Sequence, residues 1–247
     1  MIADTIARQG NWFFRRRSYV LLALTPIALI TLSQGEAVEI YFGETADHVY
    51  EGICIALAFV GLGIRAFTVG FIPAGTSGRN RREQVASTLN VSGMYSLTRN
   101  PLYFGNAVIY MSIAIFTEGV YFVVVMALFL VIYLERIIAA EERYLAARFG
   151  SAYTDWARSV PAFFPRFSGW KSPELEFSFK NVLRREYSGF FAIVVAFASI
   201  ELLEGLLIAG RLQFDAAWVV TFIVAGIVYV TLRFLNRRTT VLHVPGR

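Results

Sequence analysis

Long hydrophobic runs alternate with short polar segments along most of this chain. Each run carries few or no charged residues, and six of them can be marked: 19–33, 49–71, 102–117, 120–134, 187–207 and 216–235. A transmembrane helix needs about 20 apolar residues, with a range of about 17 to 25. The pattern predicts an all-α, polytopic membrane protein with six transmembrane helices. The first, third and fourth runs are short, which is typical of tilted or re-entrant helices.

Composition supports the membrane class. Hydrophobic residues make up 56% of the chain and aromatic residues 15%, whereas soluble domains carry about 45 to 50% apolar residues. The lone Cys54 falls inside the second run, so an intramolecular disulfide is excluded. His48 and His243 are far apart in the sequence. No metal centre and no Ser-His-Asp site is therefore predicted.

Arginines predict the orientation. They cluster before the first run, between the second and third, between the fourth and fifth, and at the C-terminus. All four segments lie on one side if every run spans, and cytoplasmic loops are the positive ones. The prediction is an integral, multi-pass protein of the bacterial inner membrane, with both termini cytoplasmic. The net charge of +5 is then explained by attraction to anionic lipid headgroups, and it requires no nucleic-acid partner.

The N-terminal run admits a second interpretation. Arg15 to Arg17 followed by 15 apolar residues also fits a signal peptide, with Ser33 and Gly35 as small residues near a cut. The parity of the predicted spans favours a retained helix. We predict three parts: an N-terminal helix with its outer loop (1–48), a core (49–167), and an interfacial loop with a C-terminal hairpin (168–247).

Two segments beside the core carry further signals. The stretch 161–173 holds three prolines and predicts a loop. The stretch 136–160 is amphipathic and predicts a helix that continues the fourth run into the cytosol, with Gly150 as its stop. An amphipathic helix of this kind also fits a simple interfacial role. Transporters commonly show paired, similarly interrupted halves, and this chain lacks them.

The polar stretch 93–105 opens the third run and carries the candidate chemistry. It places Arg99 and Asn100 at a membrane boundary, where polar groups usually mark a site. Pro101 fits the first turn of a helix, and Gly105 would allow a backbone or a ligand to approach closely. Taken alone, the stretch also fits a helix start with a snorkelling arginine. The adjacent glutamates Glu141 and Glu142 return one hairpin later and favour a site.

Together these motifs resemble the integral-membrane S-adenosylmethionine-dependent methyltransferases, the family of isoprenylcysteine carboxyl methyltransferase and the phospholipid methyltransferases. The resemblance covers about 61–165. Its elements are Gly61-x-Gly63, Gly93-x-Tyr95, Arg99-Asn100-Pro101-x-Tyr103-x-Gly105 and Glu141-Glu142. The third resembles the family's Arg-His-Pro-x-Tyr-x-Gly, with Asn100 in place of histidine, which puts any role of that imidazole in doubt.

The resemblance implies S-adenosylmethionine as cofactor, held in a pocket open to the cytosol. Arg99, Tyr103 and Glu141 are then the expected catalytic residues. An arginine suits the cofactor's carboxylate, carboxylates suit its ribose or amine, and aromatic rings suit its adenine or sulfonium. The expected cofactor-binding residues are Gly61, Gly63, Gly93, Tyr95, Arg99, Asn100, Pro101, Tyr103, Gly105, Glu141 and Glu142.

The acceptor is expected to be a lipid from the bilayer. Glycines, hydroxyls and arginines gather at 75–82, a composition that binds phosphate, although nonspecific contact with anionic lipids also fits. With 183–189, this stretch resembles the bacterial lipid A phosphate methyltransferases. The expected substrate-binding residues are Thr76, Ser77, Arg79, Asn80, Arg81, Arg82, Arg184 and Arg185.

A phosphate oxygen is already anionic at neutral pH and needs no general base, so the scarcity of histidine favours a lipid phosphate. Three alternatives remain open: amine N-methylation of a phospholipid, carboxyl O-methylation of an isoprenylcysteine type, and a membrane scaffold or transporter without catalysis. The oligomeric state is not predicted.

Overall fold

The computed structural model describes residues 2–17, 19–33, 37–76, 86–212 and 216–247. Over these residues the chain is helical and contains no strand, as predicted. The α-helices are α1 (Ile2–Arg16), α2 (Thr25–Leu32), α3 (Ala37–Phe42), α4 (Glu44–Gly70), α5 (Pro101–Phe116), α6 (Val120–Phe149), α7 (Ser151–Ser159), α8 (Phe179–Ala209) and α9 (Ala216–Arg238). Three short 3₁₀ helices join them: η1 (Val20–Leu24), η2 (Gly93–Ser96) and η3 (Phe167–Gly169).

Five helical segments within the described residues are long and apolar enough to cross a membrane: Val20–Phe42, α4, α6, Phe179–Ile208 and α9. The sixth predicted span is α5, whose 16 residues make a shorter apolar helix. At 1.5 Å per residue it measures about 24 Å, less than the ~30 Å hydrocarbon core. The first predicted run, 19–33, is not a single α-helix, because η1 and α2 divide it. The chain is a polytopic integral membrane protein.

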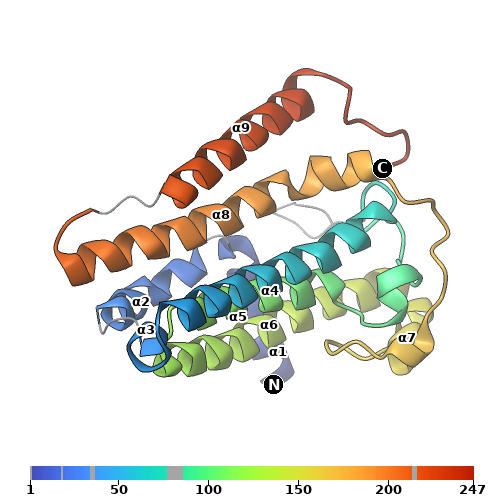
Figure 1. Cartoon of the computed structure of the whole chain (residues 1–247). Helices are drawn as coiled ribbons and strands as arrows, with labels where there is room; N and C mark the ends of the chain where they lie inside the picture. The colour runs from blue at the N-terminus through green and yellow to red at the C-terminus, as the bar shows by residue number, and fades with distance from the viewer. Residues whose placement is uncertain (1, 18, 34–36, 77–85, 213–215) are drawn as a thin grey trace.

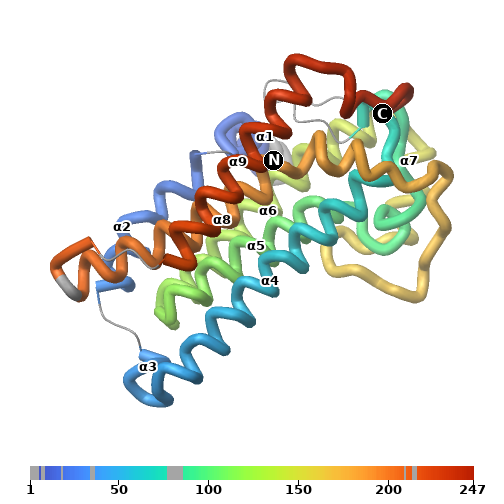
Figure 2. The backbone as a smooth tube through the Cα atoms, turned by 45° about the horizontal axis from the view of Figure 1, so that its top comes forward, coloured from blue at the N-terminus to red at the C-terminus, as the bar shows by residue number. Residues whose placement is uncertain are grey.

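The long helices form a layered bundle (Figure 1). Helix α9 packs on α8, α8 on α4, α4 on α5, α5 on α6, and α6 on α1. Helix α3 and helix α7 lie at opposite ends of this bundle (Figure 2). Bulky apolar side chains on the outer helices are exposed, among them Leu128 and Val131 of α6 and Ile223 and Ile227 of α9. Such a surface matches hydrocarbon rather than water.

Helix ends follow local chemistry. Pro101 lies in the first turn of α5, where its missing N–H removes no helical hydrogen bond. Helix α6 ends at Gly150, whose φ of 56° confirms the predicted stop. The predicted loop at 161–173 is also confirmed, since only the three-residue η3 interrupts it. Helix α1, absent from our sequence prediction, lies against α6, where Gly10 faces the carbonyl of Arg136.

Helices α4 and α5 cross at two glycines. A Cβ atom on Gly61 would lie 2.7 Å from the Gly105 carbonyl oxygen, and a Cβ atom on Gly105 would lie 2.7 Å from the Gly61 carbonyl oxygen. Each side chain would therefore collide with backbone that cannot move alone. The expected close approach at Gly105 is thus made by another helix, in the manner of small residues at membrane helix interfaces.

Replacing Gly105 with alanine is expected to lower the thermal unfolding midpoint of the detergent-solubilised protein by several degrees, because the α4–α5 crossing must open. Gly63→Ala is the matched control from the same Gly-x-Gly motif, since a Cβ atom there meets nothing within 4 Å. Equal midpoints for the two variants, measured by fluorescence-monitored unfolding, would show that the crossing does not depend on Gly105.

Candidate functional site

A cavity of about 650 Å³ lies among α4, α5, α8 and the C-terminal half of α6. Sites for small molecules commonly measure ~300–1,000 Å³. Its wall also includes residues 86–90, Phe14 and Arg17 from the N-terminal segment, and Trp156 of α7. Polar groups on the wall are concentrated toward the end of the bundle that carries α7, and apolar residues of α5 and α8 line the remainder.

The segment from Gly93 to Asn100 is held by the loop at 161–173. The Gly93 N–H donates to the Lys171 carbonyl over 2.8 Å, and the Arg99 N–H donates to the Pro161 carbonyl over 2.9 Å. The Asn100 side chain donates to the Ala162 carbonyl over 2.9 Å. Gly93 has a φ of 58°, a conformation that favours glycine. The contacts between these two segments place Arg99 and Asn100 at the N-terminal end of α5.

Arg99 forms an ion pair with Glu142. Its Nε lies 2.8 Å from Oε1 of Glu142, and its Nη2 lies 2.7 Å from the same oxygen. Nη1 donates to the Ala157 carbonyl over 2.6 Å. Arg99 thereby connects the start of α5 to α6 and α7. The structure brings together two residues predicted at one site, and it makes them partners of each other.

Tyr103 and Glu141 form a second pair on the cavity wall. The Tyr103 hydroxyl donates to Oε1 of Glu141 over 2.8 Å. Arg17, which the sequence does not predict as a site residue, also lines the cavity and lies close enough to act electrostatically on both. It reaches this position because α1 packs on α6, a tertiary contact that hydropathy does not indicate.

Arg65, Asn106 and Glu186 form a third cluster, which the sequence analysis did not predict as a site. Nε and Nη2 of Arg65 donate to the two carboxylate oxygens of Glu186 over 2.8 and 2.9 Å. Nη1 donates to Oδ1 of Asn106 over 2.8 Å. All three side chains line the cavity. They come from α4, α5 and α8 in that order, and an arginine inside the second hydrophobic run was the one available signal.

The predicted cofactor residues divide into two groups. Tyr95, Arg99, Asn100, Pro101, Tyr103 and Glu141 lie on the cavity wall. Gly61 and Gly105 lie at the α4–α5 crossing, Gly63 has open space around it, and Gly93 lies beside Pro173. Glu142 forms an ion pair with Arg99 and does not itself line the cavity. None of these four glycines lines the cavity, and Gly61 and Gly105 act on it through the α4–α5 crossing.

The predicted substrate residues are only partly described. Thr76 is buried on the cavity wall, and its hydroxyl donates to the Pro73 carbonyl over 2.8 Å. Arg185 also lines the cavity, whereas Arg184 donates to the Asn181 side chain over 2.9 Å. Ser77, Arg79, Asn80, Arg81 and Arg82 lie outside the described residues.

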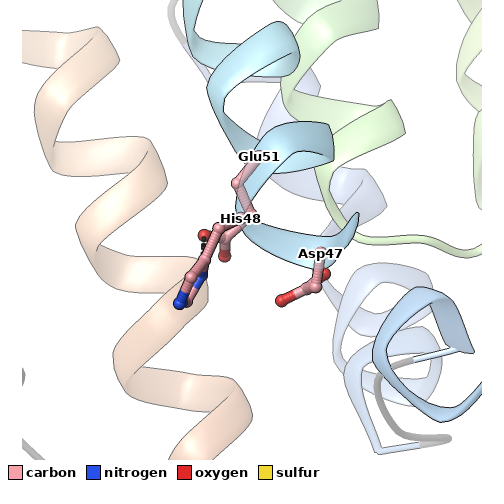
Figure 3. A group of neighbouring side chains, drawn as sticks. All are labelled: Asp47, His48 and Glu51. Carbon is pink, nitrogen blue, oxygen red and sulfur yellow. Dashed lines mark ion pairs between the residues drawn. The ribbon is translucent and has the colours of Figure 1, made fainter. Parts of the chain in front are cut away.

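A separate group of potential metal ligands lies at the other end of α4. Asp47, His48 and Glu51 offer ligand atoms within 4.8 Å of one another (Figure 3). The His48 side chain is 68% exposed. The cavity-lining residues of α4, Arg65 and Val69, lie at its opposite half. The sequence prediction did not include this group, because it considered only the separation of the two histidines and not the carboxylates beside His48 on α4.

Comparison with known proteins agrees with the resemblance. Residues 49–152 match the phospholipid methyltransferase family model, and this stretch lies inside the predicted core. The chain is 36% identical over 107 residues to the cobalt-zinc-cadmium resistance protein CzcN of Cupriavidus metallidurans, covering 43% of this chain and 48% of that protein. It is 35% identical over 123 residues to the nickel-cobalt-cadmium resistance protein NccN of Alcaligenes xylosoxydans xylosoxydans, covering 49% and 55%.

The chain thus spans about half the length of these curated relatives. No solved structure matches it. The matched stretch includes α5, most of α4 and all of α6, and so it contributes Arg65, Arg99, Tyr103 and Glu141 to the cavity wall. The part of the chain that supplies α4, α5 and α6 to this cavity is therefore similar to the phospholipid methyltransferase family.

Proposed function

We propose that the chain is an S-adenosylmethionine-dependent methyltransferase that acts on a lipid at this cavity. The observation that carries the proposal is the cavity itself: it is built in part from the region that matches phospholipid methyltransferases, and guanidinium, carboxylate and aromatic groups line it. Ionisable groups at membrane depth are costly and commonly functional. A non-catalytic scaffold does not require ionisable groups around a cavity at this depth.

The residues present fit the cofactor. Glu141 can accept hydrogen bonds from an ammonium group or a ribose diol, and Arg17 can pair with a carboxylate. Tyr95, Tyr144 and Trp156 offer aromatic faces for an adenine or a sulfonium cation. The Nε1 atom of Trp156 is buried and has no hydrogen-bond partner among the described residues. A buried donor of this kind is stabilised when a ligand supplies the acceptor.

When bound, S-adenosylmethionine supplies a methyl group that leaves its sulfur with the C–S electron pair on sulfur, while a lone pair of the acceptor forms the new bond. The chain's contribution is placement, because in-line displacement gains most from orientation. Tyr103 holds the Glu141 carboxylate in one orientation through their hydrogen bond. Arg99 and Glu142 fix the start of α5 against α6 and α7.

For the acceptor we propose a lipid phosphate oxygen, as in lipid A phosphate methylation. Four arginines line the cavity, Arg17, Arg65, Arg99 and Arg185, and three glutamates oppose them: Glu141 and Glu186 on the wall, and Glu142, which pairs with Arg99. An anionic acceptor suits this excess of positive charge and needs no proton removed before it attacks. The distribution of arginines along the sequence supports a cavity facing the cytosol, with both termini on that side.

The test is to incubate membranes containing the protein with S-adenosylmethionine labelled at the methyl group, and to identify labelled lipids by mass spectrometry. We expect the label on a phosphate-bearing fragment. Label on an amine or a carboxyl group would reject phosphate methylation and retain the methyltransferase. Membranes that label no lipid, yet bind Co²⁺ or Zn²⁺ through Asp47, His48 and Glu51, would favour instead a metal-linked role of the kind named for the two relatives.

A further inference from the structure

One side of the cavity lies outside the region that matches the family. Helix α8 begins at Phe179, beyond the match at 49–152. It nevertheless contributes a continuous strip of wall: Arg185, Glu186, Ser188, Gly189, Ala192 and Ala196. The family core supplies the opposite side, which carries Arg99, Tyr103 and Glu141. The cavity is thus composed of one side within the matched region and one side outside it.

The Arg65–Glu186 pair joins the two halves. Its two parallel hydrogen bonds measure 2.8 and 2.9 Å, and the side chains are 19% and 6% exposed. Gly105 leaves room for the arginine, since a Cβ atom there would lie 2.7 Å from its Cγ. Asn106 holds the third guanidinium nitrogen, Nη1, over 2.8 Å. Arg65 is therefore fixed in one orientation with its guanidinium plane on the cavity wall.

Fixed guanidinium groups bind planar or tetrahedral oxyanions with high geometric preference. Arg185 lies on the same wall, one residue before Glu186. Past the pair, the wall becomes apolar, with Ile113 of α5 and Ala192, Ile193 and Ala196 of α8. Ala192 lines this apolar part of the cavity and is exposed. A polar contact followed by an apolar track suits a headgroup attached to a hydrocarbon chain.

We propose that Arg65 binds the anionic oxygen of the lipid acceptor and that α8, through Glu186 and the apolar strip, determines which lipid is accepted. Glu186 is a positioning residue that orients Arg65 and acts on the acceptor through it. This inference rests on the proposed function and adds to it the residues that choose the acceptor. Arg17 and Glu141 are left to the cofactor, so acceptor and cofactor are recognised by different charged groups.

The test uses the full-length protein in lipid nanodiscs and two readouts, binding and transfer. Binding of phosphatidic acid is measured by native mass spectrometry, and binding of S-adenosylhomocysteine by calorimetry. The variants are Arg65→Lys, which keeps the charge and loses the forked geometry, Glu186→Gln, and Ala192→Leu, which adds bulk to the apolar part of the cavity wall without changing an ion pair. Lys180→Gln is the matched control, an exposed cation on α8.

We expect Arg65→Lys and Glu186→Gln to weaken lipid binding and raise the KM for lipid about tenfold or more, with the affinity for S-adenosylhomocysteine within about twofold of the parent. Ala192→Leu should raise the KM for long-chain lipid, while inorganic phosphate, which has no chain, competes equally well in parent and variant. The control should match the parent in every measurement.

Lipid binding that is unchanged in both Arg65→Lys and Ala192→Leu would overturn this inference while the methyltransferase stands. Loss of cofactor affinity in parallel with lipid affinity in both variants would also overturn it, because the two groups would then share one site. Transfer to no lipid by the parent protein, together with no affinity for S-adenosylhomocysteine, would overturn the proposed function and this inference with it.

Discussion

Replacing Glu141 with glutamine is expected to lower the affinity for S-adenosylhomocysteine about tenfold or more and to abolish methyl transfer at ordinary cofactor concentrations. Glutamine keeps the shape and accepts the Tyr103 hydrogen bond but removes the charge. A hydrogen bond to a charged group contributes about 1.5–3 kcal/mol, and ~1.4 kcal/mol corresponds to a tenfold change in affinity. Calorimetry on the purified protein measures the change directly.

Glu135→Gln is the matched control for Glu141. Glu135 lies on the same helix with its side chain 60% exposed, and it pairs with the neighbouring Arg136. Exposed pairs of this kind contribute little, so we expect unchanged cofactor affinity. Tyr103→Phe should produce an intermediate loss, because Glu141 keeps its charge and loses its fixed orientation. Unchanged affinity in Glu141→Gln would exclude Glu141 from the cofactor site.

Replacing Arg99 with alanine is expected to have two effects at once. The Glu142 carboxylate and the Ala157 carbonyl both lose their partner, so we expect destabilisation of about 2 kcal/mol or more. The start of α5 then shifts against α6, and cofactor binding should fall below detection. Thermal unfolding and calorimetry separate the two effects, and a double-mutant cycle with Glu142→Gln measures the coupling within the pair.

Arg158→Ala provides the comparison for Arg99. Arg158 also pairs with an acidic residue at the α7 end of the bundle, but both side chains are largely exposed, at 81% and 69%. We expect a change in stability within about 0.5 kcal/mol and no change in cofactor affinity. If Arg99→Ala behaved like Arg158→Ala in both measurements, neither the anchoring role nor the proposed cofactor site could be maintained.

The helices that hydropathy predicts best are those that face lipid. Helices α4, α6, α8 and α9 contain the predicted runs, since a span must be apolar wherever it meets hydrocarbon. The ends of these helices are predicted less accurately. Helix α8, for example, begins eight residues before the predicted run, in the more polar stretch 179–186. Helix α1 is not predicted by hydropathy, because its pattern is amphipathic and not continuously apolar. Its arginines indicate the orientation of the chain but not a helix.

The candidate site was predictable where its residues are close in sequence or carry a motif. Arg99 and Tyr103 are only four residues apart in the sequence, and the family resemblance connects them to Glu141. Arg65 and Glu186, in contrast, are 121 residues apart and meet only because α4 packs on α8. No periodicity contains that information. The pair also joins the matched core to a helix outside it, so a family motif would not have indicated it.

The most direct test of the central claim is an experimental structure of the protein in nanodiscs with S-adenosylhomocysteine bound. We predict ligand density in the cavity, with its polar end beside Glu141 and its adenine near Tyr144 or Trp156. Clear density at any other place, or a cavity still empty at a ligand concentration that calorimetry shows to be saturating, would contradict the account.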